Sequence, residues 1–345
     1  MTTLIDEPFE EKKKISNSHI RSLADVAKIV DILRKRCRAI IQGRDEIIDL
    51  ILIALFADGH VLLEDYPGSG KTTLAKTLGE SILDDLPEDH LPSFRRIQFT
   101  PDLLPSDITG VTVFDSDSNS FRFMRGPIFA HVVLADEINR TSPKVQSALL
   151  EAMAEKQVTV DNETHKLDDL FFVIATQNPL DLVGTYPLPL AQLDRFLFKI
   201  RMKHLTREAE LEVLSRWKKD SPPLQMPQVP RKDIVTARLF IHQEVKVSKA
   251  IHECLVDIAQ MIRTDKRVAQ GVSTRSIVLG ILALQSRAML CGSDFVAAED
   301  IEKLLIPIFC HRLDLIPGLG DPTTILQECA APALEKLVRG TMKRG

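Results

Sequence analysis

The chain has 345 residues, of which 44% are hydrophobic and 27% are charged, and its formal net charge is −4 at pH 7. This composition is typical of a globular protein long enough for two domains, and the slightly acidic balance excludes a global electrostatic attraction to nucleic acid or to an anionic membrane. The five cysteines are scattered without metal-ligand spacing, residues 1–14 are polar and charged, and no apolar run is long enough to span a bilayer, so we expect a cytoplasmic protein without a membrane partner.

The first part of the chain alternates short apolar runs with helical patterns. Residues 1–18 are expected to form a polar tail, and apolar residues at helical spacing predict helices over 20–41 and 45–58. Short buried strands are predicted at 61–63, 96–99, 131–134, 171–175 and 196–200, with a helix over 143–155. Buried strands that alternate with helices predict an α/β fold, in which a mostly parallel sheet is covered by helices on both faces.

Two β-hairpins interrupt this alternation, and helices follow it. Alternating side chains around turn-forming tips predict hairpins over 111–123 and 157–167. Beyond residue 203 the strands are expected to stop, and helices are predicted at 204–217, 231–242, 248–264, 273–291, 297–309 and 322–340. We therefore expect three parts: a tail (1–18), an α/β domain (19–203) and an all-α domain (204–345).

The segment between residues 60 and 73 predicts a phosphate-binding loop. An apolar run leads into a glycine-rich turn, which opens a helix with Lys71 and Thr72, so backbone N–H groups would converge on an anion. Lys71 would approach the β- and γ-phosphates of a nucleotide, and the Thr72 hydroxyl would bind Mg²⁺. The candidate nucleotide-binding residues are Asp65, Tyr66, Pro67, Gly68, Ser69, Gly70, Lys71, Thr72 and Thr73. The alternative is an ordinary strand–turn–helix connection, because Asp65 replaces the first glycine of the usual pattern.

Two polar positions follow later apolar runs. Asp136 and Glu137 end one run, where the first acid would hold Mg²⁺ and the second would polarise the water that attacks the γ-phosphate. Asn178 ends the next run, where its amide would contact the γ-phosphate and the attacking water. The alternatives are a helix cap formed by Asp136 and a turn formed by Asn178 before Pro179.

Two arginines are candidates for stabilising charge in the transition state. Arg195 lies at the exit of a short helix, and Arg275 lies at the start of a helix in the second domain. An arginine that reaches the γ-phosphate stabilises the transition state of phosphoryl transfer. The alternative for each is a surface ion pair.

Together these residues resemble the MoxR family of AAA+ ATPases over roughly residues 20–315. The resemblance extends beyond the nucleotide motifs to 96–107, 136–140, 146–153 and 184–189, and Asp65 agrees with the pattern of the family. Thr274 departs from it, because the family more often has proline before the arginine of the second domain. The resemblance is specific, since it covers strings that nucleotide binding by itself does not require.

The resemblance implies an AAA+ αβα nucleotide-binding domain, an all-α lid and a homo-oligomer, a hexameric ring. It implies ATP or ADP and Mg²⁺ as ligands, Arg195 as the finger that reaches the ATP of a neighbouring subunit, and Arg275 as the lid sensor of its own subunit. Gly43 and Arg44 match the segment that packs near adenine. The two hairpins match inserts of the clade that includes magnesium chelatases and MCM helicases.

The resemblance favours an ATP-driven chaperone that remodels or matures protein clients with a partner containing a von Willebrand factor A (VWA) domain. The alternatives are a nucleic-acid motor of the MCM-like branch, a magnesium-chelatase-like subunit, and a nucleotide-gated scaffold that hydrolyses slowly. The hairpin tips oppose the nucleic-acid motor because their acids would repel phosphates: Asp115, Asp117, Asp161 and Glu163. We therefore expect no nucleic-acid partner.

Overall fold

A five-stranded parallel sheet organises the first part of the molecule. The computed structural model describes residues 20–64, 69–86, 89–179, 184–216 and 226–342. The strands lie in the order β10-β1-β9-β6-β3, and every neighbouring pair is parallel. Their bounds are Val61–Glu64 (β1), Phe94–Gln98 (β3), Val132–Asp136 (β6), Phe172–Gln177 (β9) and Phe198–Arg201 (β10). The prediction of a parallel α/β sheet is confirmed.

Successive residues of the central strands enter two different cores. In β9, Phe172 and Ile174 belong to one apolar cluster, whereas Val173 and Ala175 belong to the other. This alternation follows from the twofold period of a strand, and it explains why β6 and β9 read as continuous apolar runs. Because the strands are parallel, the residues that follow β1, β6 and β9 meet at one edge, here called the carboxyl edge.

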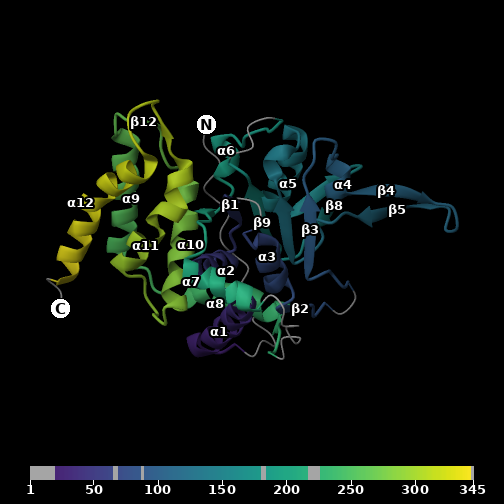
Figure 1. The fold of residues 1–345 in the computed structure, drawn as a ribbon, viewed down its shortest axis with the longest axis horizontal. Coiled ribbons are helices and arrows are strands. Elements are labelled where there is room, and N and C mark those ends of the chain that lie inside the picture. The colour runs from purple at the N-terminus through teal and green to yellow at the C-terminus, as the bar shows by residue number, and fades with distance from the viewer. Residues whose placement is uncertain (1–19, 65–68, 87–88, 180–183, 217–225, 343–345) are drawn as a thin grey trace.

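Helices cover both faces of the sheet (Figure 1). The first core includes side chains of three helices, α1 (Leu23–Ile40), α2 (Asp45–Phe56) and α3 (Lys71–Gly79), while α5 (Pro143–Glu155) packs into the second. Pro143 occupies the first turn of α5, where its fixed φ suits a helix start, and Lys156 ends the helix in the left-handed conformation. Short helical turns complete this part: α4 (Pro105–Thr109), η1 (Ile138–Arg140) and α6 (Leu190–Leu193).

Both predicted hairpins are present. The strands β4 (Gly110–Asp115) and β5 (Ser120–Arg125) form a ribbon that projects away from the sheet (Figure 1). The second hairpin pairs β7 (Gln157–Val160) with β8 (Glu163–Lys166). Its two turn residues, Asp161 and Asn162, both have positive φ, which is the backbone that a two-residue hairpin turn requires.

The second part of the chain is mostly helical. Its helices are α7 (Arg207–Arg216), α8 (Arg231–Glu244), α9 (Lys249–Thr264), α10 (Thr274–Leu290), α11 (Ala298–Phe309), η2 (Cys310–Arg312) and α12 (Pro322–Met342).

The expectation that strands stop after residue 203 is wrong in detail. Two short pairs occur, between β2 (Ile82–Leu83) and β11 (Val229–Pro230) and between β12 (Val268–Gln270) and β13 (Asp314–Leu315). Strands of two or three residues are too short to display alternation, so the sequence pattern could not reveal them.

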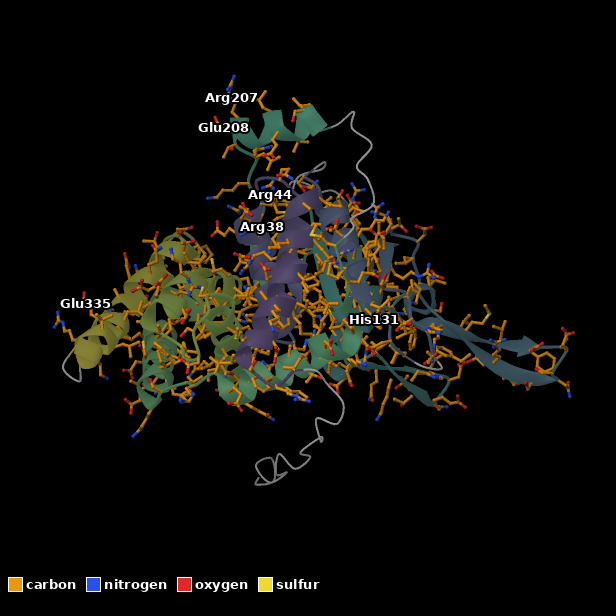
Figure 2. All side chains as sticks on the ribbon, turned by 90° about the horizontal axis from the view of Figure 1, so that it is seen from below. Arg38, Arg44, His131, Arg207, Glu208 and Glu335 are labelled. Atoms are coloured by element: carbon orange, nitrogen blue, oxygen red, sulfur yellow. The ribbon has the colours of Figure 1, made fainter. Side chains whose placement is uncertain are left out.

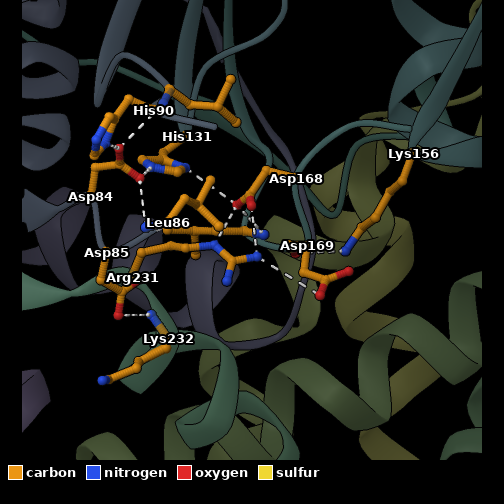
Figure 3. Close-up of polar contacts among 12 residues, drawn as sticks. Asp84, Asp85, Leu86, His90, His131, Lys156, Asp168, Asp169, Arg231 and Lys232 are labelled. Carbon is orange, nitrogen blue, oxygen red and sulfur yellow. Dashed lines mark hydrogen bonds and ion pairs between the residues drawn. The ribbon is translucent and has the colours of Figure 1, made fainter. Parts of the chain in front are cut away.

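A buried polar cluster joins α8 to the opposite edge of the sheet, where the parallel strands begin, here called the amino edge (Figure 3). His131, which precedes β6, lies between two carboxylates, 3.2 Å from Asp168 through Nδ1 and 3.1 Å from Asp84 through Nε2. Arg231 donates to the same Asp168 at 2.6 Å. Burial would raise the pKa of Asp168, but the hydrogen bonds from His131 and Arg231 hold the pKa of that carboxyl well below its usual range. The cluster therefore fixes charged groups far from the carboxyl edge.

Among the helices that the structure describes, none combines the length and apolar character needed to cross a bilayer.

Candidate functional site

The predicted phosphate loop leads into the first turn of α3. Of its residues, Asp65, Tyr66, Pro67 and Gly68 lie outside the described part of the chain, while 69–73 are described. Gly70 precedes the helix with φ +91°, a backbone that favours glycine, and its carbonyl accepts from the amide of Leu74 at 2.9 Å. The N–H groups at the start of a helix have no partner within the helix, so Lys71, Thr72 and Thr73 offer amides to an anion.

Lys71 faces the end of β6. Its Nζ lies 3.4 Å from Oδ1 of Asp136, and both side chains are largely buried. The hydroxyl of Thr176 donates to the same Oδ1 at 2.6 Å, and Arg96 donates to Oδ2 at 2.7 Å. Burial opposes ionisation of Asp136, but these donors and the Lys71 charge lower the pKa of the carboxyl. Asp136 is therefore an anion at neutral pH and ends a strand, and it does not cap a helix.

Glu137 holds its carboxylate beside β3. Its backbone is left-handed, with φ +61°, and its amide donates to the Thr176 hydroxyl at 2.8 Å. Oε2 accepts from the side-chain amide of Gln98 at 2.9 Å and lies 3.5 Å from Arg140. A left-handed non-glycine residue is costly, so its presence here is typical of a functional position. The structure thus brings Lys71, Asp136 and Glu137 together at the carboxyl edge.

Asn178 occupies the same edge, directly after β9. It is mostly buried, and its carbonyl accepts from the side chain of Asn139 at 3.5 Å. Because β9 lies between β1 and β6, Asn178 emerges between the phosphate loop and Asp136. Contact of its side-chain amide with a γ-phosphate stays a prediction.

The donors available to a cation suit Mg²⁺. Asp136 offers carboxylate oxygens and Thr72 offers a hydroxyl from the first turn of α3. Mg²⁺ prefers oxygen ligands, and it binds through one or two protein groups together with waters and substrate phosphates. In the described ranges no group of three or more His, Cys, Asp or Glu residues is placed to hold a metal ion.

The turn of Gly43 and Arg44 meets the chain that leaves β10. A Cβ placed on Gly43 would lie 2.5 Å from that of Ala209, so glycine allows close contact with α7. Arg44 donates to the carbonyl of Lys203. Figure 2 shows Arg44 beneath α7, which bears Arg207 and Glu208. The neighbouring Met202 receives a long contact, 3.9 Å, from the Ser69 hydroxyl, which links this turn to the phosphate loop.

Arg195 lies at the opposite, amino edge. It precedes β10, and Leu197 donates to the carbonyl of His60, which precedes β1. The Arg195 guanidinium donates at 2.5 Å to the carbonyl of Leu150 in α5. It borders a cleft of about 480 Å³ lined by Ser147, Leu150, Glu151, Glu155, Gln157, Gln192 and Arg195. The guanidinium therefore points away from the phosphate loop of its own chain.

Arg275 is exposed in the first turn of α10, and its neighbours fix that turn at the amino edge. The hydroxyls of Ser273 and Ser276 donate to Asp194 at 3.1 and 2.8 Å. In this conformation the length of β1 separates Asp194 from Lys71, and the role of Arg275 as a lid sensor stays a prediction. The sequence placed α10 after the sheet but contained no information about which edge it would reach.

Sequence reasoning missed three residues of the site: Arg96, Gln98 and Thr176. Arg96 and Gln98 are two residues apart in β3, so their side chains lie on the same face of the strand. Gln98 is paired in register with Asp136. Polar residues two apart at the end of a short edge strand were the available signal. Thr176 gave a similar signal, as a hydroxyl at the end of the apolar run that precedes Asn178.

The comparisons with known proteins agree with this geometry. Residues 60–198 match the model of the ATPase family associated with various cellular activities (AAA), and residues 260–329 match an AAA lid domain. The Chaperone MoxR1 of Mycobacterium tuberculosis is 36% identical over 81% of this chain and 74% of its own length. An uncharacterised Bacillus subtilis protein, YeaC, is 48% identical over 80% of this chain and 83% of its own length.

A solved structure has the same fold. It is a crystal structure from Cytophaga hutchinsonii whose protein is described as a presumed ATPase, and it aligns with a TM-score of 0.81 at 33% identity. The alignment covers 90% of this chain and 95% of that one. The sheet order and the helical second part are therefore those of a known architecture.

Proposed function

Because the chain belongs to the MoxR family of AAA+ ATPases, we propose that it binds ATP with Mg²⁺ and hydrolyses it at the carboxyl edge of its sheet. The observation that carries this proposal is the convergence of Lys71, Asp136 and Glu137. Lys71 and the first amides of α3 bind the phosphates, while Asp136 and Thr72 hold the cation. Mg²⁺ supplies charge neutralisation on the β- and γ-phosphate oxygens.

Glu137 is the proposed base that accepts a proton from the attacking water. Its carboxylate lies one residue beyond Asp136, and Asn178 emerges from the adjacent strand to orient the same water. The hydrogen bond from Gln98 and the nearby Arg140 hold this carboxylate beside β3. An ionised carboxylate within reach of the water is what general-base catalysis requires.

Arg195 and Arg275 are proposed to complete the site of a neighbouring subunit in a hexameric ring. Both lie at the amino edge of their own sheet, away from Lys71, so neither reaches its own phosphate loop in this conformation. An arginine supplied by a neighbour stabilises the charge that develops on the transferred phosphoryl group. Hydrolysis would then require assembly.

The test is a Mg²⁺-dependent ATPase and nucleotide-binding assay. Lys71→Ala removes the positive charge next to Asp136, so ATP affinity is expected to fall at least tenfold. Glu137→Gln keeps the shape without the base, so binding is expected to stay within about threefold while kcat falls on the order of 10²-fold or more. Unchanged ATP affinity in Lys71→Ala, or parental turnover in Glu137→Gln, would contradict the assigned site.

We further propose that the cycle drives chaperone-like remodelling of protein clients with a VWA-domain partner, as the resemblance to the family suggests. The name of the Mycobacterium relative supports the chaperone role. A VWA-domain protein recovered with the Glu137→Gln variant, which holds ATP, should raise the parental ATPase rate when purified and added back. Single-stranded DNA or RNA that stimulates the ATPase instead would favour the nucleic-acid motor.

A further inference from the structure

The carboxylate of Asp194 connects the helical part of the chain to the segment that carries Arg195. Arg312 of η2 donates to Oδ1 of Asp194 at 2.6 Å, and the Ser276 hydroxyl of α10 donates to the same atom at 2.8 Å. The Ser273 hydroxyl donates to Oδ2 at 3.1 Å. One side chain, adjacent in sequence to Arg195, therefore receives donors from two separate helical elements.

The backbone around Arg195 is held by the same elements. Arg312 is 2% exposed and also donates to the carbonyls of Asp194, Phe196 and Leu197, at 3.3, 2.8 and 3.2 Å. His311 lies 3.0 Å from the carbonyl of Phe196 through Nε2. The carbonyls on both sides of Arg195 are thus bonded to η2, so the backbone of Arg195 follows η2 when the helical part moves.

The other arginine of the proposed interface is tied to the same carboxylate. Arg275 stands between Ser273 and Ser276 in the first turn of α10, and both serines are bonded to Asp194. Hydrogen bonds from the two serine hydroxyls to the carboxylate of Asp194 therefore set the distance between the backbones of Arg195 and Arg275. Burial lowers the pKa of Arg312, the hydrogen bond to Asp194 opposes this, and the charge of Arg275 adds to the lowering.

We infer that Asp194, Ser276 and Arg312 are positioning residues that hold Arg195 and Arg275 as one unit for the nucleotide of the next subunit. The inference rests on the proposed function, since it requires Arg195 to act in trans. Its consequence is that a movement of the helical part shifts both arginines together. Misplacing a catalytic group by about 1 Å costs on the order of 10²-fold in rate, so loosening this connection should lower turnover without removing either arginine.

The primary test is the double substitution Ser273→Ala and Ser276→Ala. It removes two of the three side-chain donors to Asp194 and leaves the ion pair with Arg312, so the fold is expected to persist. Ser248→Ala is the matched control. Ser248 caps the start of α9 by the same kind of bond that Ser273 makes at the start of α10, but its cap bond, from the amide of Ile251, does not involve Asp194. We expect kcat of the double variant to fall about tenfold relative to the control, with ATP affinity unchanged within twofold.

A second variant tests the carboxylate itself. Asp194→Asn keeps the shape of the side chain but leaves the buried Arg312 without its counter-charge. We expect a larger loss of kcat than in the double variant, again with ATP affinity preserved. If kcat of both variants stays within twofold of the Ser248→Ala control, or if ATP affinity falls in parallel with kcat, the positioning role is overturned.

Mixed rings separate positioning from a merely structural role. The double variant retains its own Lys71 and Glu137, so Glu137→Gln subunits with an intact Asp194 connection should restore its turnover in trans. Arg195→Ala mixed with Glu137→Gln is the reference, and both mixtures are first shown to co-assemble. If Glu137→Gln subunits restore turnover to Arg195→Ala but not to the double variant, this inference is overturned and the proposed function is left intact. Failure of both mixtures overturns the action of Arg195 in trans, and the inference falls with it.

Discussion

The side-chain amide of Gln98 donates a hydrogen bond of 2.9 Å to Oε2 of Glu137. The orientation of that amide is set by Arg96, which donates to the Gln98 oxygen at 2.7 Å and also binds Asp136. A chain of polar contacts therefore runs from the proposed cation ligand to the proposed base. The donor stabilises the Glu137 carboxylate and restricts its rotation toward a water molecule.

Gln98→Ala should raise the basal ATPase rate. The substitution removes one hydrogen bond to a charged group, worth about 1.5 kcal/mol, so kcat is expected to rise by up to about tenfold. The matched control is Gln177→Ala, because Gln177 makes the same kind of bond, 2.8 Å to Glu64, at the end of β9. A lower rate in Gln98→Ala than in the control would mean that the bond holds Glu137 in its productive position.

Thr176→Val should weaken the cation site. The Thr176 hydroxyl joins Oδ1 of Asp136 to the amide of Glu137, and it is completely buried. Loss of an outer partner of a metal ligand typically costs 10- to 100-fold in metal affinity, so the Mg²⁺ concentration for half-maximal ATPase activity should rise by at least about tenfold. Thr176→Ser retains the hydroxyl and should stay near the parental value. An unchanged Mg²⁺ requirement in Thr176→Val would show that Asp136 is positioned without this bond.

Arg195→Ala should abolish turnover and preserve nucleotide binding. Its guanidinium rests on the carbonyl of Leu150, away from its own phosphate loop. Removal of an arginine finger typically costs on the order of 10³-fold or more in rate. ATP affinity should remain within twofold, and the specific activity of the parental protein should rise with its concentration as rings form. Arg339→Ala, on the exposed face of α12, is the control, and full activity of a dilute monomer would contradict the ring.

Acid should destabilise the fold through His60. This ring is buried, its Nδ1 accepts from the amide of Val173 at 3.1 Å, and its Nε2 lies 3.2 Å from the carbonyl of Met153. Burial is the main reason that the pKa of His60 falls to about 4. The unfolded chain binds the proton near pH 6.5 and the folded chain does not, so stability is complete above pH 6.5 and declines as the pH falls toward 4.

Urea unfolding at pH 7, 6 and 5 measures this effect. One pKa unit corresponds to about 1.4 kcal/mol, so His60 by itself is expected to lower stability by about 2 kcal/mol between pH 7 and pH 5. Burial also lowers the pKa values of His242 and His311, so the total decrease in the parental protein should be larger. His60→Asn keeps an acceptor for Val173 but does not titrate, so its stability should change less over the same interval. Carboxylates with lowered pKa values lose their contribution only below about pH 4, outside this window. A parental stability that is flat from pH 7 to pH 5 would contradict the assignment.

The local sequence pattern determined the α/β class, the hairpins and the residues at the carboxyl edge. Parallel strands bring their ends to one edge, so Lys71, Asp136 and Asn178 could be grouped from chain position without any tertiary information. The division of the chain at residue 203 stays a prediction. The tertiary structure shows in addition that α8 packs against α1 and α2 and that Arg238 binds the carbonyl of Leu55.

The tertiary structure decided the partners of each side chain of the proposed site and the location of Arg275. Arg96, Gln98 and Thr176 come from two different strands, and their contacts depend on the register of those strands beside β6. Arg275 lies at the amino edge because Asp194 accepts hydrogen bonds from Ser276 in the first turn of α10 and from Arg312 of η2. Periodicity reports the surroundings of a residue along its own element, whereas a long-range ion pair depends on how separate elements pack, which local spacing does not encode.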